Sequence, residues 1–309
     1  MEAEALIEQS LSGGADPMLM RLIHSLRRAA WSAFSHSAFT NAKAAAYSAI
    51  LSLFPALLVV TTLLALSPET DTFRGEIRTG FSELLPPDTM SLVQAYFQTN
   101  HARSVRLIWT SSFVTIGASM GVMLSLMEGF RRAYLLPRGE WGFWRERFVA
   151  LALVPGTLVP MIFATALVAF GHVIELWMID NADHELRFYV LLIGRIARWS
   201  MAVLTSVAVL GVIYHFGTPR KRPWEKVVPG AVLATATWFL ATLIYGWYLT
   251  RYADYSVVYG SLGAGVATLV WLYMVCFSIL IGAEFNAQIF PAVPRPSHID
   301  DEKAVALRT

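Results

Sequence analysis

Long apolar runs dominate the pattern of hydrophobic and polar positions along the chain. Six stretches contain no Asp, Glu, Lys or Arg, and they cover residues 44–66, 107–127, 148–170, 199–216, 227–249 and 257–283. A helix needs roughly 20 residues to cross a bilayer core of about 30 Å. Because lipid offers no hydrogen bonds to the backbone, each run is expected to be an α-helix. The pattern therefore predicts an all-α integral membrane protein, built as a six-transmembrane-helix bundle.

Three further segments lie outside the predicted spans. Residues 1–43 form an N-terminal segment, in which 17–38 has the spacing of an amphipathic helix. This helix fits the membrane interface or a surface of the spans equally well. Residues 67–106 predict a pair of short periplasmic helices separated by Pro86-Pro87. The membrane domain then extends over 44–290, and a disordered tail is expected at 291–309.

Composition supports the membrane assignment. Of 309 residues, 56% are hydrophobic and only 15% are charged, and the formal net charge is +2. So few charges cannot cover a water-facing surface of this size. The single cysteine, Cys276, excludes a disulfide scaffold. The small net charge gives no reason to expect nucleic acid as a partner.

The distribution of basic residues predicts the orientation. Sixteen Lys and Arg residues belong to the two terminal segments and the loops at 128–147 and 217–226, and eight fall on the opposite side. The opposite loop at 171–187 is acidic. Because basic loops stay in the cytoplasm, both termini are expected to be cytoplasmic. The basic turn at 220–226 fits a topology determinant and a contact for anionic lipids.

Several short motifs are distributed through the chain. In order they are Ala46-Tyr47, Leu51-Ser52-Leu53-Phe54-Pro55, Arg132-Ala133-Tyr134, Trp144-Arg145-Glu146-Arg147, Tyr214-His215-Phe216, Pro229-Gly230-Ala231, Tyr259-Gly260-Ser261-Leu262-Gly263, Trp271-Leu272-Tyr273 and Gly282-Ala283-Glu284-Phe285-Asn286-Ala287. With these motifs in this order, residues 40–290 resemble the YihY/BrkB family of bacterial inner-membrane proteins, historically labelled ribonuclease BN-like. The resemblance implies a six-helix bundle in the inner membrane. It transfers no catalytic residues.

The ribonuclease label can be tested against the chemistry that it requires. Metal-dependent phosphodiester hydrolysis needs clustered His and carboxylate ligands. The seven histidines are scattered over both sides of the membrane, and no metal-binding string of His and carboxylates occurs. We therefore expect no metal, no cofactor and no enzymatic activity.

Glu284 is the most informative carboxylate because it lies at the cytoplasmic end of the sixth span. The helix dipole disfavours an anion there, so a cationic partner is expected. Arg131 and Arg132 at the end of the second span are the predicted partners, and Glu128 competes for them one helical turn away. Two interpretations remain open, namely a structural ion pair and a gate or headgroup-binding site.

A second polar cluster is predicted at the outer turn, where Asp254, Tyr255 and Tyr259 lie near Arg251. It fits either ordinary turn chemistry or a contact with a lipid headgroup or substrate. Small residues and a proline in the spans predict close helix packing or local flexibility. They are Pro55, Gly117, Gly121, Gly260, Ser261, Gly263 and Gly265.

Together these features favour transport or export, acting on a lipid-like or amphipathic envelope substrate that the sequence does not identify. The alternative is an envelope interaction or assembly factor that transports nothing. Membrane lipids are the expected partners, and the sequence leaves homo-oligomerisation open.

Overall fold

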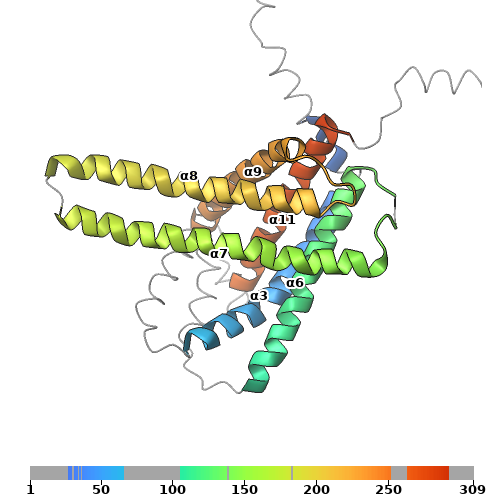
Figure 1. Cartoon of the computed structure of the whole chain (residues 1–309), viewed down its shortest axis with the longest axis horizontal. Coiled ribbons are helices and arrows are strands. Elements are labelled where there is room, and N and C mark those ends of the chain that lie inside the picture. Colours follow the sequence, from blue (N-terminus) through green and yellow to red (C-terminus); the bar gives the residue numbers. More distant parts are fainter. Residues whose placement is uncertain are drawn as a thin grey trace, which may run out of the picture.

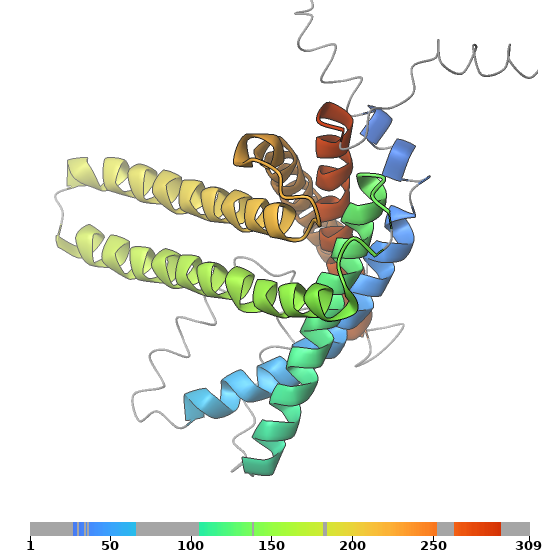
Figure 2. The ribbon, with the colours of Figure 1, turned by 45° about the vertical axis from the view of Figure 1, so that its right-hand side comes forward.

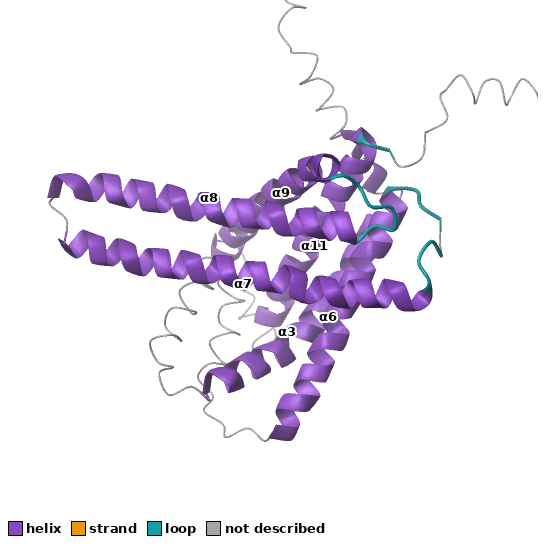
Figure 3. Ribbon diagram, in the orientation of Figure 1, coloured by secondary structure: helices purple, strands orange, loops and turns teal. Residues whose placement is uncertain are grey.

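The protein is described by a computed structural model over residues 27–29, 31–33, 35, 37–65, 105–137, 139–181, 184–251 and 263–291. These residues contain helices and turns but no strand (Figure 3). The six long helices are α3 (Ala38–Ala65), α6 (Val105–Ala133), α7 (Phe143–Asn181), α8 (His184–Phe216), α9 (Trp224–Arg251) and α11 (Gly263–Ile289). The predicted all-α architecture with six long helices is confirmed.

All six helices are long and apolar enough to cross a bilayer. Large apolar side chains remain exposed along their outer surfaces, including Phe113 at 81% and Leu204 at 68%. In water this exposure would be costly, whereas in lipid it costs nothing. Proline inside a helix, as at Pro55 in α3, is tolerated in membranes because neighbouring helices and local adjustments satisfy the freed backbone groups.

The helices pack mainly against their neighbours in the chain. α3 lies along α6, α6 contacts α7, α7 pairs with α8, and α8 contacts α9. α11 packs against α9 and returns to α3 and α6, which closes the ring of contacts (Figure 1). The last helix therefore joins the two halves of the chain.

α7 and α8 form an antiparallel pair that extends away from the other helices in both views (Figures 1 and 2). α7 has 39 residues, which corresponds to about 58 Å of helix and exceeds a hydrocarbon core of about 30 Å. The acidic segment at 171–187 was expected to be a loop. Except for 182–183, which lie outside the described residues, it is helical. The apolar run 148–170 predicted the part of α7 that can lie in the membrane, but α7 continues beyond it to Asn181.

The core lies mainly at one end of the bundle. We call this the basic end and define it by the turns at 134–142 and 217–223 and by residues 290–291. Its main cluster includes Phe130, Tyr214, Val227 and Leu280, each at most 2% exposed. The far ends of α3 and α6 point away from those of α7 and α8 in both views (Figures 1 and 2). The fold is thus packed most tightly at the basic end.

The described part of the predicted N-terminal amphipathic helix packs on this end. Ala29 and Ala33 are fully buried, and Gln288 of α11 donates a 2.7 Å hydrogen bond to the Ser32 hydroxyl. Trp31 beside them is 78% exposed. The predicted periplasmic helical pair and the C-terminal tail lie outside the described residues, apart from Val105 and Arg106 at the start of α6 and Pro291.

A candidate polar site at the basic end

Two glycines bring α9 and α11 into backbone contact at the basic end. A methyl group on Gly230 would meet the carbonyl oxygen of Gly282, and a methyl group on Gly282 would meet that of Gly230. A Cβ at Gly282 would also lie 2.5 Å from the Tyr214 hydroxyl. Small residues allow this approach in membranes, where helix association depends on packing and interhelical hydrogen bonds.

A fully buried amide joins the same two helices. The Oδ1 atom of Asn286 accepts a 2.7 Å hydrogen bond from the Gly230 N–H, and its Nδ2 donates a 2.9 Å bond to the Val227 carbonyl. The Tyr214 hydroxyl of α8 donates a 2.6 Å bond to the Ile279 carbonyl of α11. Each of these polar groups is buried, so the hydrogen bonds offset a desolvation cost.

An ionisable cluster lies beside this junction. Glu284 is 1% exposed and Tyr134 is 2% exposed. The Arg222 guanidinium carbon lies 4.1 Å from the centroid of the Tyr134 ring, and Nη1 donates to the Phe290 carbonyl at the end of α11. A cation at this position offsets the negative end of the α11 dipole.

Burial shifts the pKa values of Tyr134 and Arg222, which lie outside the spans. It raises the pKa of Tyr134 to about 12, with the Arg222 charge opposing the shift and the Glu284 carboxylate adding to it. Burial also lowers the pKa of Arg222 from its ordinary value. A guanidinium titrates so far above neutral pH that Arg222 still keeps its charge there. At physiological pH the cluster therefore contains a neutral phenol beside a cation.

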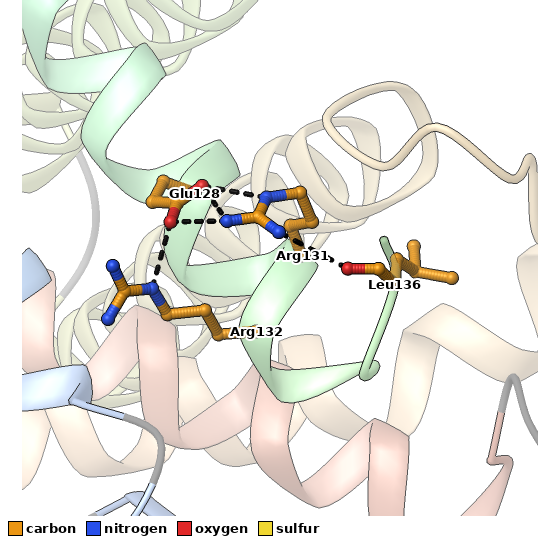
Figure 4. Close-up of polar contacts among 4 residues, drawn as sticks. All are labelled: Glu128, Arg131, Arg132 and Leu136. Atoms are coloured by element: carbon orange, nitrogen blue, oxygen red, sulfur yellow. Dashed lines mark hydrogen bonds and ion pairs between the residues drawn. The ribbon is translucent and has the colours of Figure 1, made fainter. Parts of the chain in front are cut away.

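The arginines at the end of α6 bind the carboxylate of their own helix (Figure 4). Arg131 Nε donates to Glu128 Oε2 at 2.7 Å, and Arg132 Nε donates to Glu128 Oε1 at 2.9 Å. Arg131 also donates to the Leu136 carbonyl at 3.2 Å, which fixes the following turn. In the described part of the chain neither arginine forms an ion pair with Glu284, which differs from the predicted pairing. Glu128 is favoured because it lies three and four residues away on the same helix face.

The predicted packing residues have different surroundings. Gly121 of α6 faces Ser48 of α3, where an added Cβ would lie 3.0 Å from the hydroxyl oxygen. Gly117 and Gly265 have no such neighbour within 4 Å. Gly263 is buried at the start of α11, and Pro55 lies inside α3. Asp254, Tyr255, Tyr259, Gly260 and Ser261 lie outside the described residues, so the predicted outer cluster stays a prediction.

The junction residues Asn286, Gly230, Gly282 and Tyr214 were not predicted as site residues, and neither was Arg222. A signal for four of them was present, because they belong to the short motifs at 214–216, 229–231 and 282–287. These motifs are far apart in the sequence, and the fold brings them into contact at the basic end. Among the described residues, no three His, Cys, Asp or Glu side chains are grouped so that they could hold a metal ion.

Comparison with known proteins identifies the family to which these motifs belong. The family described as virulence factor BrkB matches residues 31–302, which include all six helices and the junction. The chain belongs to the BrkB family. Its six long apolar helices make it a multi-pass membrane protein.

Several curated relatives cover most of the chain. The ribonuclease-like protein YfkH of Bacillus subtilis is 27% identical over 254 residues, which are 82% of this chain and 90% of that protein. A UPF0761 membrane protein of Vibrio vulnificus is 22% identical, covering 81% of this chain and 77% of its own length. A UPF0761 membrane protein of Tolumonas auensis is 25% identical, over 79% of this chain and 78% of its own length. No solved structure matches the chain.

Proposed function

We propose that this BrkB protein transports or exports a lipid-like or amphipathic substrate across the bacterial inner membrane. The observation that carries the proposal is Glu284, which is 1% exposed near the end of the last helix of a six-helix bundle. An ionisable group inside a membrane bundle is expensive to bury, and groups of this kind mark substrate pathways and gates in membrane proteins.

The uneven packing of the bundle supports a gate at this end. α6, α8, α9 and α11 meet tightly at the basic end, whereas the far ends of α3 and α6 diverge from those of the α7–α8 pair (Figure 2). Transporters alternate between arrangements in which one end of the bundle is packed and the other is open. Opening the basic end would separate Gly230 from Gly282 and break both hydrogen bonds of Asn286.

We further propose that the basic end faces the cytoplasm. The turns at 134–142 and 217–223 and the adjoining helix ends carry most of the Lys and Arg residues of the loops. The positive-inside rule then places both termini in the cytoplasm. In this orientation Glu284 belongs to a cytoplasmic gate, and substrate would leave or enter the far side where α3 and α6 diverge from the α7–α8 pair.

The second candidate is an envelope interaction or assembly factor that moves nothing. The close Gly230–Gly282 contact supports this alternative, because a junction that never opens would also be packed tightly. The two candidates differ in whether the purified protein moves a solute or lipid.

The test is a reconstitution assay in liposomes. Fluorescent phospholipids report movement between leaflets, and trapped amphipathic anions report release. We expect the wild-type protein to move at least one of these classes and Glu284→Gln to slow it by about tenfold or more. Glu225→Gln is the matched control, because Glu225 is an exposed carboxylate at the same end, and its rate should stay within twofold. A folded wild-type protein that moves none of them would contradict transport and favour the assembly factor.

A further inference from the structure

A pocket opens at the basic end, between the 217–223 turn and the end of α11. It has a volume of about 430 Å³ and is lined by Arg220, Lys221, Arg222, Pro223, Lys226, Ile289, Phe290 and Pro291. Typical ligand pockets enclose roughly 300–1,000 Å³. The pocket therefore has the size of a small-ligand site and combines a cationic side with an apolar wall.

The lining has an excess of positive charge. It contains four basic residues and no carboxylate. Arg220 is neutralised by Glu140, whose Oε1 lies 2.8 Å from Arg220 Nη2. Within the described ranges, Lys221, Arg222 and Lys226 form no ion pair. Three cations are thus available to one anionic ligand.

Arg222 is held in place before any ligand binds. It is 9% exposed, its guanidinium lies over the Tyr134 ring, and Nη1 donates to the Phe290 carbonyl. The His215 Nδ1 atom lies 2.5 Å from the Arg222 carbonyl oxygen, which fixes the backbone of the turn. No hydrogen bond of Nε or Nη2 occurs with the described residues. A fixed guanidinium with free donors suits bidentate recognition of a phosphate.

The start of α9 adds to the positive electrostatic potential of the pocket. α9 begins at Trp224, so its first turn, including Lys226, borders the pocket. The N–H groups of a first helical turn point out of the helix and carry partial positive charge, which favours an anion. The negative end of α11 lies nearby, but Arg222 already binds its terminal Phe290 carbonyl.

We propose that this pocket binds a phosphate group, supplied either by the headgroup of an anionic lipid or by free inorganic phosphate. Lys221 and Lys226 attract the anion, Arg222 orients it, and Ile289 and Phe290 contact the apolar part of a lipid. The site does not depend on transport, because binding requires no movement of the helices.

The test measures binding to the full-length protein in phosphatidylcholine nanodiscs. One arm titrates short-chain phosphatidylglycerol, and the other titrates inorganic phosphate. The variant is Lys221→Gln combined with Lys226→Gln, since both side chains are exposed and their loss leaves the core intact. The matched control is Lys43→Gln combined with Arg145→Gln, two exposed cations outside the pocket that belong to the cytoplasmic set predicted from the sequence.

A basic residue near an anionic lipid contributes about fivefold to affinity, so the pocket variant should bind at least about tenfold more weakly than wild type. The control should bind within about twofold of wild type. Binding of phosphatidylglycerol alone identifies a site for a lipid headgroup. Binding of inorganic phosphate in its own titration identifies a site for the phosphate group itself. Equal loss of binding in the pocket variant and the control, or no binding in either arm, would overturn the proposal.

Discussion

Asn286 in α11 is bound to Gly230 in α9 by a 2.7 Å hydrogen bond from the Gly230 N–H to the side-chain oxygen. The same amide donates to the Val227 carbonyl one turn earlier. One side chain therefore joins two helices beside the crossing where Gly230 and Gly282 bring their backbones together. Asn286 and Gly230 are buried at this junction, so water cannot replace the hydrogen bonds between the two helices.

Replacing Asn286 should destabilise the protein strongly. Asn286→Leu removes both hydrogen bonds between α11 and α9. The expected loss is about 1–3 kcal/mol, since each of the two hydrogen bonds contributes about 0.5–1.5 kcal/mol. Thermal unfolding in detergent measures the change.

Asn41 provides the control for this prediction. It is 7% exposed, but its amide nitrogen makes no hydrogen bond to the described residues. Asn41→Leu should therefore change the unfolding temperature much less. Equal effects of the two substitutions would show that the Asn286 hydrogen bonds contribute nothing specific.

Adding a methyl group at the helix crossing should also destabilise the protein. In Gly282→Ala the new Cβ meets the Gly230 carbonyl, the Tyr214 hydroxyl and the Ala234 side chain. Overpacking of this kind costs about 1–3 kcal/mol. Gly117→Ala has nothing to meet within 4 Å, so it should be neutral or stabilising by up to about 1 kcal/mol. The measurement is the unfolding temperature of each variant in detergent. Equal unfolding temperatures for Gly282→Ala and Gly117→Ala would contradict the close helix crossing at Gly282.

The sequence predicted the six helices well because charge-free runs report directly on the cost of charge in lipid. It predicted the packing glycines less well. Gly117 and Gly121 are four residues apart on one face of α6, but only Gly121 has a partner near enough to limit a side chain. A small-residue pattern identifies a helix face, and it does not tell where along that face another helix crosses.

The pairing of Glu284 could not be derived for a related reason. The sequence placed Glu284, Glu128 and two arginines at the same end of the bundle, but the choice among partners depends on distance. Glu128 contacts both arginines because the helix itself sets that spacing. Arg222 was assigned to a basic turn, and its burial against Tyr134 depends on how that turn folds over α6.

Alkaline pH should destabilise the protein through Tyr134. Its pKa is raised to about 12 by burial, against 10.0 in the unfolded chain, so the folded state favours the neutral phenol. This contribution is complete below pH 10 and is lost as the pH rises from about 10 to about 12. At about 1.4 kcal/mol for each pKa unit, the loss is roughly 2–3 kcal/mol.

The measurement is the unfolding temperature in detergent at several pH values between 9 and 12. Tyr134→Phe should lessen the decrease over this range, because phenylalanine has no proton to lose. Tyr47→Phe is the control, since Tyr47 is 61% exposed. Identical pH profiles for wild type and Tyr134→Phe would show that Tyr134 does not ionise in this way.

The ion pairs of α6 should show coupling within the helix. Double-mutant cycles combine Glu128→Gln with Arg131→Gln and, separately, with Arg132→Gln. Measured by unfolding in detergent, each cycle should give a coupling free energy of about 0.2–1 kcal/mol. The Arg131 cycle should give the larger value, because its side chain is 15% exposed against 34% for Arg132. Cycles of Glu284→Gln with either arginine should be additive. Coupling to Glu284 instead would mean that these arginines change partner in solution.

Reporter fusions test the orientation on which the proposed gate depends. Fusions after residues 138 and 222 should score as cytoplasmic, and fusions near 85, 180 and 254 as periplasmic. The physical reason is the excess of Lys and Arg in the loops at 128–147 and 217–226. A variant with Arg220, Lys221 and Lys226 all replaced by Gln tests whether these charges set the orientation, and Lys221 and Lys226 are both exposed. This variant should give a weaker cytoplasmic score at residue 222 than the wild-type chain. A periplasmic score at 138 in the wild-type chain would invert the bundle. Glu284 and the basic pocket would then face the periplasm, where anionic lipid of the cytoplasmic leaflet could not reach them.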